Sequence, residues 1–245
     1  MKIYKSIVTI LFCVYNLTAK SQIDISFPNL KKISVDTSFV KVIFGYDSKT
    51  TRLIRKKCFE LPKTDQWHCD NEDAGEIIEI VGKYANDKIS DSIQIVYDPG
   101  LSVDPEFIIT KTNGKIMGRV AALEFYINNN GVIYSAGHIN NMFNKRRKFQ
   151  LYIDTLIEIQ QPFYYVGLKT KTASPLTLYH SKSGNEIIAQ LPKDYEIEVL
   201  LCDTEKNKSQ KFYLVKTDFG LVGWLRLTDD STFETPAKGL FYKGD

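Results

Sequence analysis

The sequence lacks the short motifs that usually mark nucleotide-dependent or hydrolytic enzymes. It contains no Walker loop, no GxGxxG fingerprint, no GxSxG nucleophile elbow and no HExxH zinc motif. Only three histidines occur in 245 residues, and no two share a spacing that would place them on one face as metal ligands. These absences lower the expectation of an enzyme, and the sequence predicts neither a cofactor nor a metal site.

The chain also lacks an excess of charge of one sign. Its formal net charge of +3 comes from residues 1–21, which hold three lysines and no acidic residue. The rest of the chain carries 29 basic and 29 acidic residues. Nucleic-acid-binding domains usually show a strong basic excess, so nucleic acid is not expected as a partner.

Long apolar runs are missing except near the N-terminus. Lys2 and Lys5 precede an apolar run over residues 7–17, and small residues follow up to Ser21. This order is typical of a secretory signal peptide, and the run is shorter than the roughly 20 residues that span a membrane. We therefore expect residues 1–21 to be a signal peptide, followed by a periplasmic, cell-surface or secreted protein without a transmembrane segment.

Cysteine is scarce, with three residues after the predicted signal peptide: Cys58, Cys69 and Cys202. In an oxidising compartment, Cys58 and Cys69 could close a short loop as a disulfide. Their spacing does not fix the Cα separation that such a bond requires, so the sequence leaves the bridge open. Cys202 lies in an apolar stretch and is expected to be a buried thiol.

Helical periodicity with caps is absent, whereas strand patterns recur along the chain. Residues 39–44 form an apolar run typical of a buried strand, and residues 92–97 alternate between polar and apolar positions. Three strand–turn–strand units follow, over residues 107–120, 123–135 and 149–159. The sequence therefore predicts an all-β protein.

The turns of these units favour antiparallel hairpins. Asn113-Gly114 and Asn130-Gly131 form the first two turns, and an Asn-Gly pair accepts positive φ at both central positions. The third turn is less typical and could be a longer or bulged connection. We expect an antiparallel, sandwich-like meander within residues 22–160.

The C-terminal part resembles the bacterial Src-homology-3-like module over about residues 165–227, roughly a quarter of the chain. Its most characteristic element is the sequence from Gly220 to Leu225, in which a turn glycine precedes Gly-Trp and an aliphatic residue. The resemblance implies a small barrel over residues 161–245 and a role in binding cell-wall peptides, glycans or proteins. Two positions depart from the family pattern, because Lys193-Asp194 occupies a turn that usually has glycine and Phe212 lies near a usual tryptophan.

The predicted module is dense in aromatic residues, of which about half should fill a barrel of this size. The remainder could line a groove for an extended peptide or sugar chain. We expect Tyr164, Tyr179 and Tyr195 to face solvent as ligand-binding residues. The family resemblance places Trp224 in a closing core strand.

The densest charge run consists of Lys145, Arg146, Arg147 and Lys148. The simpler interpretation is a solvated hairpin end, and the alternative is contact with an anionic glycan, a phosphate or a partner protein. The basic residues 55–57 would extend this patch if the two strands paired.

A catalytic alternative pairs Cys69 with His138 as nucleophile and base. The acidic residues that follow Cys69, from Asp70 to Asp73, oppose thiolate formation, so a structural or disulfide role for Cys69 is favoured. A metal site formed by His68 with Asp70 and Asp73 is a weaker alternative, since acidic turn residues usually cap backbone amides.

These features predict an exported, non-catalytic binding protein that docks on a cell-wall peptide, a glycan or an envelope protein. One alternative is a cell-envelope cysteine hydrolase that uses Cys69 and His138. A second is an immunity- or inhibitor-type protein that uses the basic run.

Overall fold

The computed structural model describes residues 27–36, 40–49, 51–64, 68, 70, 76–83, 92–98, 104–111, 113–203, 210–228 and 234–244. This part of the chain contains seventeen β-strands and one 3-10 helix, Cys58–Glu60. The prediction of an all-β protein is confirmed. Within the same ranges, no helix has the length and apolar character needed to cross a lipid bilayer.

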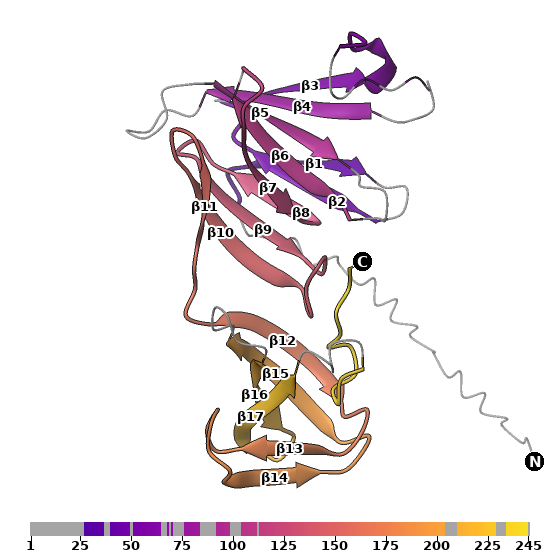
Figure 1. The fold of residues 1–245 in the computed structure, drawn as a ribbon, viewed down its shortest axis with the longest axis vertical. Helices are drawn as coiled ribbons and strands as arrows, with labels where there is room; N and C mark the ends of the chain where they lie inside the picture. Colours follow the sequence, from indigo (N-terminus) through magenta and orange to yellow (C-terminus); the bar gives the residue numbers. More distant parts are fainter. Residues whose placement is uncertain are drawn as a thin grey trace, which may run out of the picture.

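One six-stranded sheet, the first sheet, has the order β1-β2-β8-β9-β10-β11 (Figure 1). Its strands are β1 (Lys31–Asp36), β2 (Val42–Tyr46), β8 (Glu124–Ile127), β9 (Val132–Gly137), β10 (Lys145–Leu151) and β11 (Leu156–Ile159). Neighbours are antiparallel except β2 and β8, which are parallel. The expected antiparallel arrangement is interrupted at this pair, because the chain builds a whole second sheet before it returns beside β2.

That second sheet is a five-stranded antiparallel meander. Its strands are β3 (Thr51–Lys57), β4 (Glu76–Lys83), β5 (Ser92–Asp98), β6 (Glu106–Lys111) and β7 (Ile116–Ala121), in this order. β3 pairs with β4, so its basic residues 55–57 belong to a different sheet from β10. The pairing that would have extended the basic run of β10 does not form.

The first two predicted hairpins are present, with a different turn geometry. Gly114 and Gly131 have φ of 82° and 74°, whereas neither Asn113 nor Asn130 has positive φ. The amide of Gly114 donates to the carbonyl of Lys111 at 2.9 Å, and the turn at Gly131 closes in the same way. Each is therefore a type I turn followed by a glycine bulge, the usual three-residue connection.

The third predicted hairpin joins β10 and β11, and its turn also contacts the second sheet. The amide of Tyr152 donates to the carbonyl of Thr155 at 2.9 Å. Asp154 forms ion pairs with Lys111 and, at 3.5 Å, with Lys115. The hydrogen bond from Lys111 lowers the pKa of Asp154. These charges connect the two sheets at one edge.

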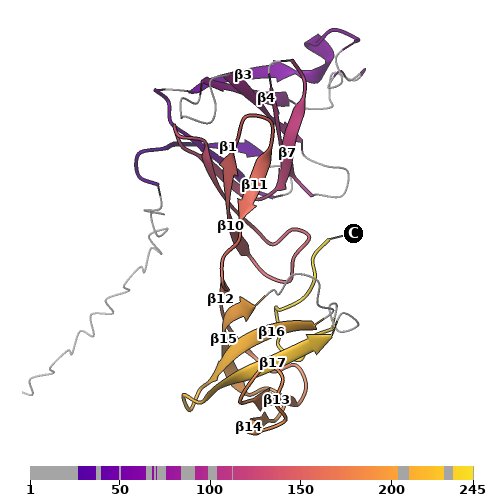
Figure 2. The same cartoon turned by 60° about the vertical axis from the view of Figure 1, so that its left-hand side comes forward.

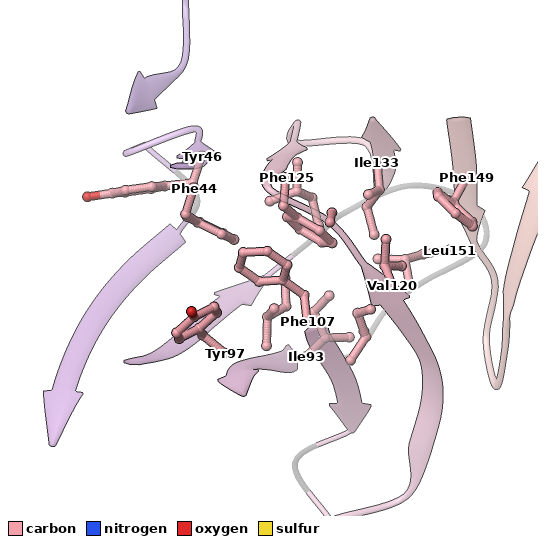
Figure 3. Packing of buried hydrophobic residues seen from close by; sticks show 14 of the residues in the cluster. Phe44, Tyr46, Ile93, Tyr97, Phe107, Val120, Phe125, Ile133, Phe149 and Leu151 are labelled. Carbon is pink, nitrogen blue, oxygen red and sulfur yellow. The ribbon is translucent and has the colours of Figure 1, made fainter. Parts of the chain in front are cut away.

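The two sheets pack face to face around an aromatic centre (Figure 3). Phe107 of the second sheet is fully buried, and its ring centroid lies 4.5 Å from that of Phe125 and 5.7 Å from that of Phe44. Phe44 and Phe125 belong to the first sheet. Alternate residues of both sheets thus supply one shared core, which confirms the predicted sandwich-like arrangement.

The C-terminal sheet forms a second hydrophobic cluster, drawn below the sandwich in Figure 1. Its order is β12-β15-β16-β17-β13-β14, with all neighbours antiparallel. The strands are β12 (Tyr164–Lys171), β13 (Leu176–Tyr179), β14 (Ile187–Leu191), β15 (Glu196–Asp203), β16 (Gln210–Thr217) and β17 (Val222–Thr228). Within the described residues no strand pairing joins β12 to β14, so hydrogen bonding leaves this sheet open.

The connection between β9 and β10 joins the two parts of the molecule. Met142 and Phe143 lie in this connection and are buried in the C-terminal cluster, where the Phe143 ring meets Tyr213 edge-on at 6.3 Å. Asn141 forms an isolated antiparallel bridge with Lys243 near the chain end. Figure 2 shows β10 running down toward β12, and the two strands contact each other. The sandwich therefore contributes side chains to the core of the C-terminal part.

Candidate functional site

The outer face of the C-terminal sheet carries a continuous row of large apolar side chains, which we call the aromatic stripe. Strand register aligns Tyr165 of β12 with Leu201 of β15, Leu201 with Leu214 of β16, Leu214 with Trp224 of β17, and Trp224 with Tyr179 of β13. Directly opposed residues in antiparallel strands project to the same face. The stripe thus crosses five strands at right angles to their direction.

The aromatic stripe is partly open to solvent. Tyr165 is 57% exposed, and the other four side chains are half-buried. At the β13 end, the guanidinium of Arg226 lies 3.9 Å from the centroid of the Tyr179 ring, and Lys182 lies 5.8 Å from that of Trp224. At the other end, Arg146 lies 5.9 Å from the centroid of the Tyr165 ring, but more than half of the Tyr165 side chain is exposed, so the Tyr165 end is the more accessible half.

A row of alternating charges runs beside the stripe on the same face. Register places Lys169 next to Glu198 and Glu198 next to Lys216. The Lys216–Glu198 pair is separated by 4.0 Å, and Lys171 lies 3.4 Å from Glu196. These residues line a depression of about 420 Å³. A ligand lying on the stripe would meet both positive and negative charges along its edge.

An apolar turn lies at one end of this depression. The turn between β16 and β17 exposes Phe219 at 82%, Val222 at 44% and Leu221 at 41%. Gly220 has a φ of 96° and forms the bulge that closes the turn, with its amide donating to Thr217. Three neighbouring exposed apolar side chains make this turn an apolar surface patch.

The three tyrosines predicted to face solvent have different positions. Tyr164 is only 1% exposed, so its expected surface position is wrong; it lies opposite buried Cys202, and its neighbour Tyr165 projects to the outer face opposite Leu201. Tyr179 lies on the stripe. Tyr195 precedes β15 and packs partly against the C-terminal core, away from the stripe. Trp224, expected in the core, is only half-buried on the outer face.

The basic run forms β10 rather than the end of a hairpin, which corrects the simpler interpretation. Alternation along the strand places Lys145 and Arg147, both half-buried, on the inner face with buried Phe149. Arg146 and Lys148 are exposed on the outer face. The run is therefore two pairs of cations on opposite faces, which reduces their mutual repulsion.

The inner pair belongs to a polar cluster at the junction between the two parts. The Tyr164 hydroxyl donates to Glu158 at 3.0 Å, and the Lys145 ammonium lies 4.1 Å from the centroid of the Tyr164 ring. Burial, reinforced by Glu158, raises the pKa of Tyr164 to about 12. Burial lowers the pKa of Lys145 and Arg147, opposed by the charge of Glu158. The buried cations thus depend on Glu158 for compensation.

Of the catalytic candidates Cys69 and His138, only His138 lies within the described residues. Nε2 of His138 donates to the carbonyl of Phe241 at 2.9 Å, and its ring packs on the Phe241 ring at 4.9 Å. The side chains of Cys58 and Cys69 lie outside the described residues, and so does their predicted disulfide. Cys202 is a buried free thiol, as expected, and burial raises its pKa to about 11.

The other histidine-based candidate is the metal site of His68, Asp70 and Asp73, of which the structure describes His68 and Asp70. Nε2 of His68 lies 3.2 Å from the carboxylate of Asp70, and Nδ1 bonds the carbonyl of Leu61 at 2.9 Å. Asp73 lies outside the described ranges. Among the described residues, no group of three or more histidine, cysteine or acidic side chains is arranged to hold a metal ion.

Comparison with protein-family models, with curated protein sequences and with solved structures found no match. The geometry of the stripe, the charged depression beside it and the basic strand β10 therefore carry the functional argument.

Proposed function

We propose that the protein is an exported, non-catalytic binding protein whose C-terminal part, a Src-homology-3-like module, docks on an extended cell-wall peptide. The observation that carries this proposal is the in-register row from Tyr165 to Tyr179 across five strands. In this proposal, residues 22–160 form a separate domain that orients the module.

The dimensions of the stripe suit an extended peptide. Neighbouring strands lie about 4.8 Å apart, so a row across five strands is about 19 Å long. An extended chain advances about 3.3 Å per residue and would cover the row with roughly six residues. Rigid aromatic rings with one polar end are well suited to such contacts, because they offer large apolar area at low conformational cost.

The charges beside the stripe favour a peptide over a neutral sugar chain. Lys169, Glu198 and Lys216 alternate in sign along one edge. A peptide that carries both carboxylates and amines can add charge contacts to these ion pairs, which neutral hydroxyl groups cannot do.

The test is retention of the purified mature protein on isolated cell wall, measured by co-sedimentation. Tyr165→Ala should lower retention at least tenfold, because Tyr165 is the most exposed ring of the stripe and truncation of an aromatic hot spot typically costs about 2 kcal/mol or more. Phe163→Ala is the matched control. Phe163 is 43% exposed and lies just before β12, off the stripe, so this variant should bind like the wild type.

Two further results decide the ligand class. Removal of the peptides from the cell wall by an amidase should abolish retention if the stripe binds peptide. Undiminished retention on the bare glycan would instead assign the stripe to sugar chains. Circular dichroism and thermal melting of both variants should match the wild type, and equal retention by Tyr165→Ala and wild type would refute the role of the stripe.

A further inference from the structure

The outer face of the first sheet carries a second in-register row, unrelated to the aromatic stripe. Register aligns Lys32 of β1 with Gly45 of β2, Gly45 with Tyr126 of β8, Tyr126 with Tyr134 of β9, and Tyr134 with Lys148 of β10. A Cβ at position 45 would lie 2.4 Å from the Tyr126 ring, so only a glycine at this position allows the ring to lie over β2. The row is an aromatic floor with a cation at each end.

Phe27 covers part of this floor. Its ring centroid lies 4.8 Å from the centroids of both Tyr126 and Tyr134. Phe27 also has a φ of 59°, a conformation that a bulky residue adopts only where its surroundings impose it. The Lys32 ammonium lies 5.3 Å from the Tyr126 centroid, and Lys148 lies 5.9 Å from that of Tyr134. The three rings form one rigid apolar wall.

The adjacent row supplies opposite charges. Register places Ala136 of β9 between Glu124 of β8 and Arg146 of β10. The backbones of β8 and β10 are about 10 Å apart, and the small Ala136 side chain leaves the space between the two charges open. A cavity of about 180 Å³ results, and its lining includes Phe27 and these three residues.

Three charged side chains line this cavity: Glu124, Arg146 and Arg147. Arg147 donates to the carbonyl of Ala121 at 2.5 Å, whereas Glu124 and Arg146 are not paired with each other. One oxygen of Glu124 accepts the Tyr126 hydroxyl at 2.8 Å, which leaves the carboxylate with further acceptor capacity. The Arg146 guanidinium lies 5.9 Å from the centroid of the Tyr165 ring, and no ion pair involves it among the described residues. A simple anion would face Glu124, and a simple cation would face Arg146.

We propose that this cavity binds a small zwitterion, either a free α-amino acid or a dipeptide, whose two ends carry the same pair of charges. The ligand carboxylate binds the planar fork of Arg146, the ligand ammonium binds Glu124, and the apolar side chain packs on Phe27, Tyr126 and Tyr134. This proposal does not rest on the proposed function of the aromatic stripe, although the two surfaces meet where Arg146 lies over Tyr165.

The test is calorimetric titration of the mature protein with L-leucine, the dipeptides Leu-Gly and Gly-Leu, leucinamide and 4-methylpentanoate. Leucinamide lacks the carboxylate, and 4-methylpentanoate lacks the ammonium. We expect binding of L-leucine or of one dipeptide, with both fragments at least tenfold weaker, because each leaves one charge of the site unpaired. Stronger binding of a dipeptide than of leucine identifies a dipeptide as the ligand.

Variants locate the site. Arg146→Gln and Glu124→Gln should each weaken binding at least tenfold, and Ala136→Leu should abolish it by filling the cavity. Arg119→Gln, which changes an exposed arginine on β7 of the second sheet, is the control and should stay within about twofold. The proposal is overturned if no amino acid or dipeptide binds, if either fragment binds as tightly as leucine, or if Ala136→Leu binds normally. Arg146 is exposed, so its variant should fold, which thermal melting checks.

Discussion

The two parts of the molecule use the same construction and present different surfaces. In each, strand register aligns aromatic side chains from separate strands into one row on the outer face. In the first sheet the tyrosines are covered by Phe27 and flanked by cations. In the C-terminal sheet the row begins at Tyr165, which is open to solvent. The covered row suits a small ligand at its margin, and the open row suits an extended one.

In both parts, the alignment of side chains across neighbouring strands identifies a candidate binding surface, in addition to any pocket nearby. Each outer row depends on a core that holds its strands in place, and the two cores are separate clusters that meet at the β9–β10 connection. A substitution that destabilises one core should therefore leave the stability of the other core unchanged.

Phe107→Ala should have the largest effect. Phe107 is fully buried and contacts Phe44 and Phe125, so its removal should cost about 3–5 kcal/mol of unfolding free energy. Hydrogen exchange should show lost protection in β5 to β8, while β15 to β17 remain protected. Equal loss of protection in both parts would mean that the two cores unfold as one unit, which would contradict their description as separate cores.

Tyr164→Phe tests the junction that holds the two parts together. The lost hydrogen bond to Glu158 is charge-assisted, so we expect a loss of about 1.5–3 kcal/mol near neutral pH. Because the folded-state pKa of Tyr164 is about 12, above its ordinary value of 10.0, this tyrosine stabilises the fold fully below pH 10.

That contribution falls as the pH rises from 10 toward 12, because the unfolded chain then loses its tyrosine proton before the folded one does. The difference between wild type and Tyr164→Phe should therefore shrink above pH 10. Denaturant titrations at pH 8 and at pH 11 measure it, and a constant difference would show that Tyr164 ionises equally in both states.

Local sequence patterns predicted many of the strands and hairpins, but they did not predict how the strands assemble into sheets. Alternation and Asn-Gly turns locate the hairpins at Gly114 and Gly131, because both signals act within a few residues. The parallel pairing of β2 with β8 joins segments about eighty residues apart. Such a pairing depends on the packing of two whole sheets, which no local pattern encodes.

The candidate site was harder to predict for a related reason. Alternation places the neighbours Tyr164 and Tyr165 on opposite faces, but the packing of the whole C-terminal sheet decides which face the core covers. The sequence alone therefore did not distinguish buried Tyr164 from exposed Tyr165. The basic run forms the start of β10, and alternation along a strand separates exposed Arg146 and Lys148 from half-buried Lys145 and Arg147. A strand prediction for this run would therefore have indicated Arg146 and Lys148 as its outer residues.

Gly114→Ala and Gly220→Ala form a matched pair, one in each part. Both glycines have positive φ, of 82° and 96°, and a Cβ at either position would meet nothing within 4 Å. The cost is then backbone strain alone, about 1–2 kcal/mol at each site. Denaturant unfolding of the two variants should give similar losses. A much larger loss for one of them would show that its turn has a further role in the assembly of its sheet.

Phe219→Ser should have the smallest effect on stability, and it tests whether the two surfaces bind different ligands. The side chain is 82% exposed, so the free energy of unfolding should change by less than about 0.5 kcal/mol. Because Phe219 lies in the turn beside the charged depression, we expect weaker retention on cell wall. Binding of L-leucine at the first sheet should not change, and a parallel loss of both activities would show that the two surfaces serve one ligand.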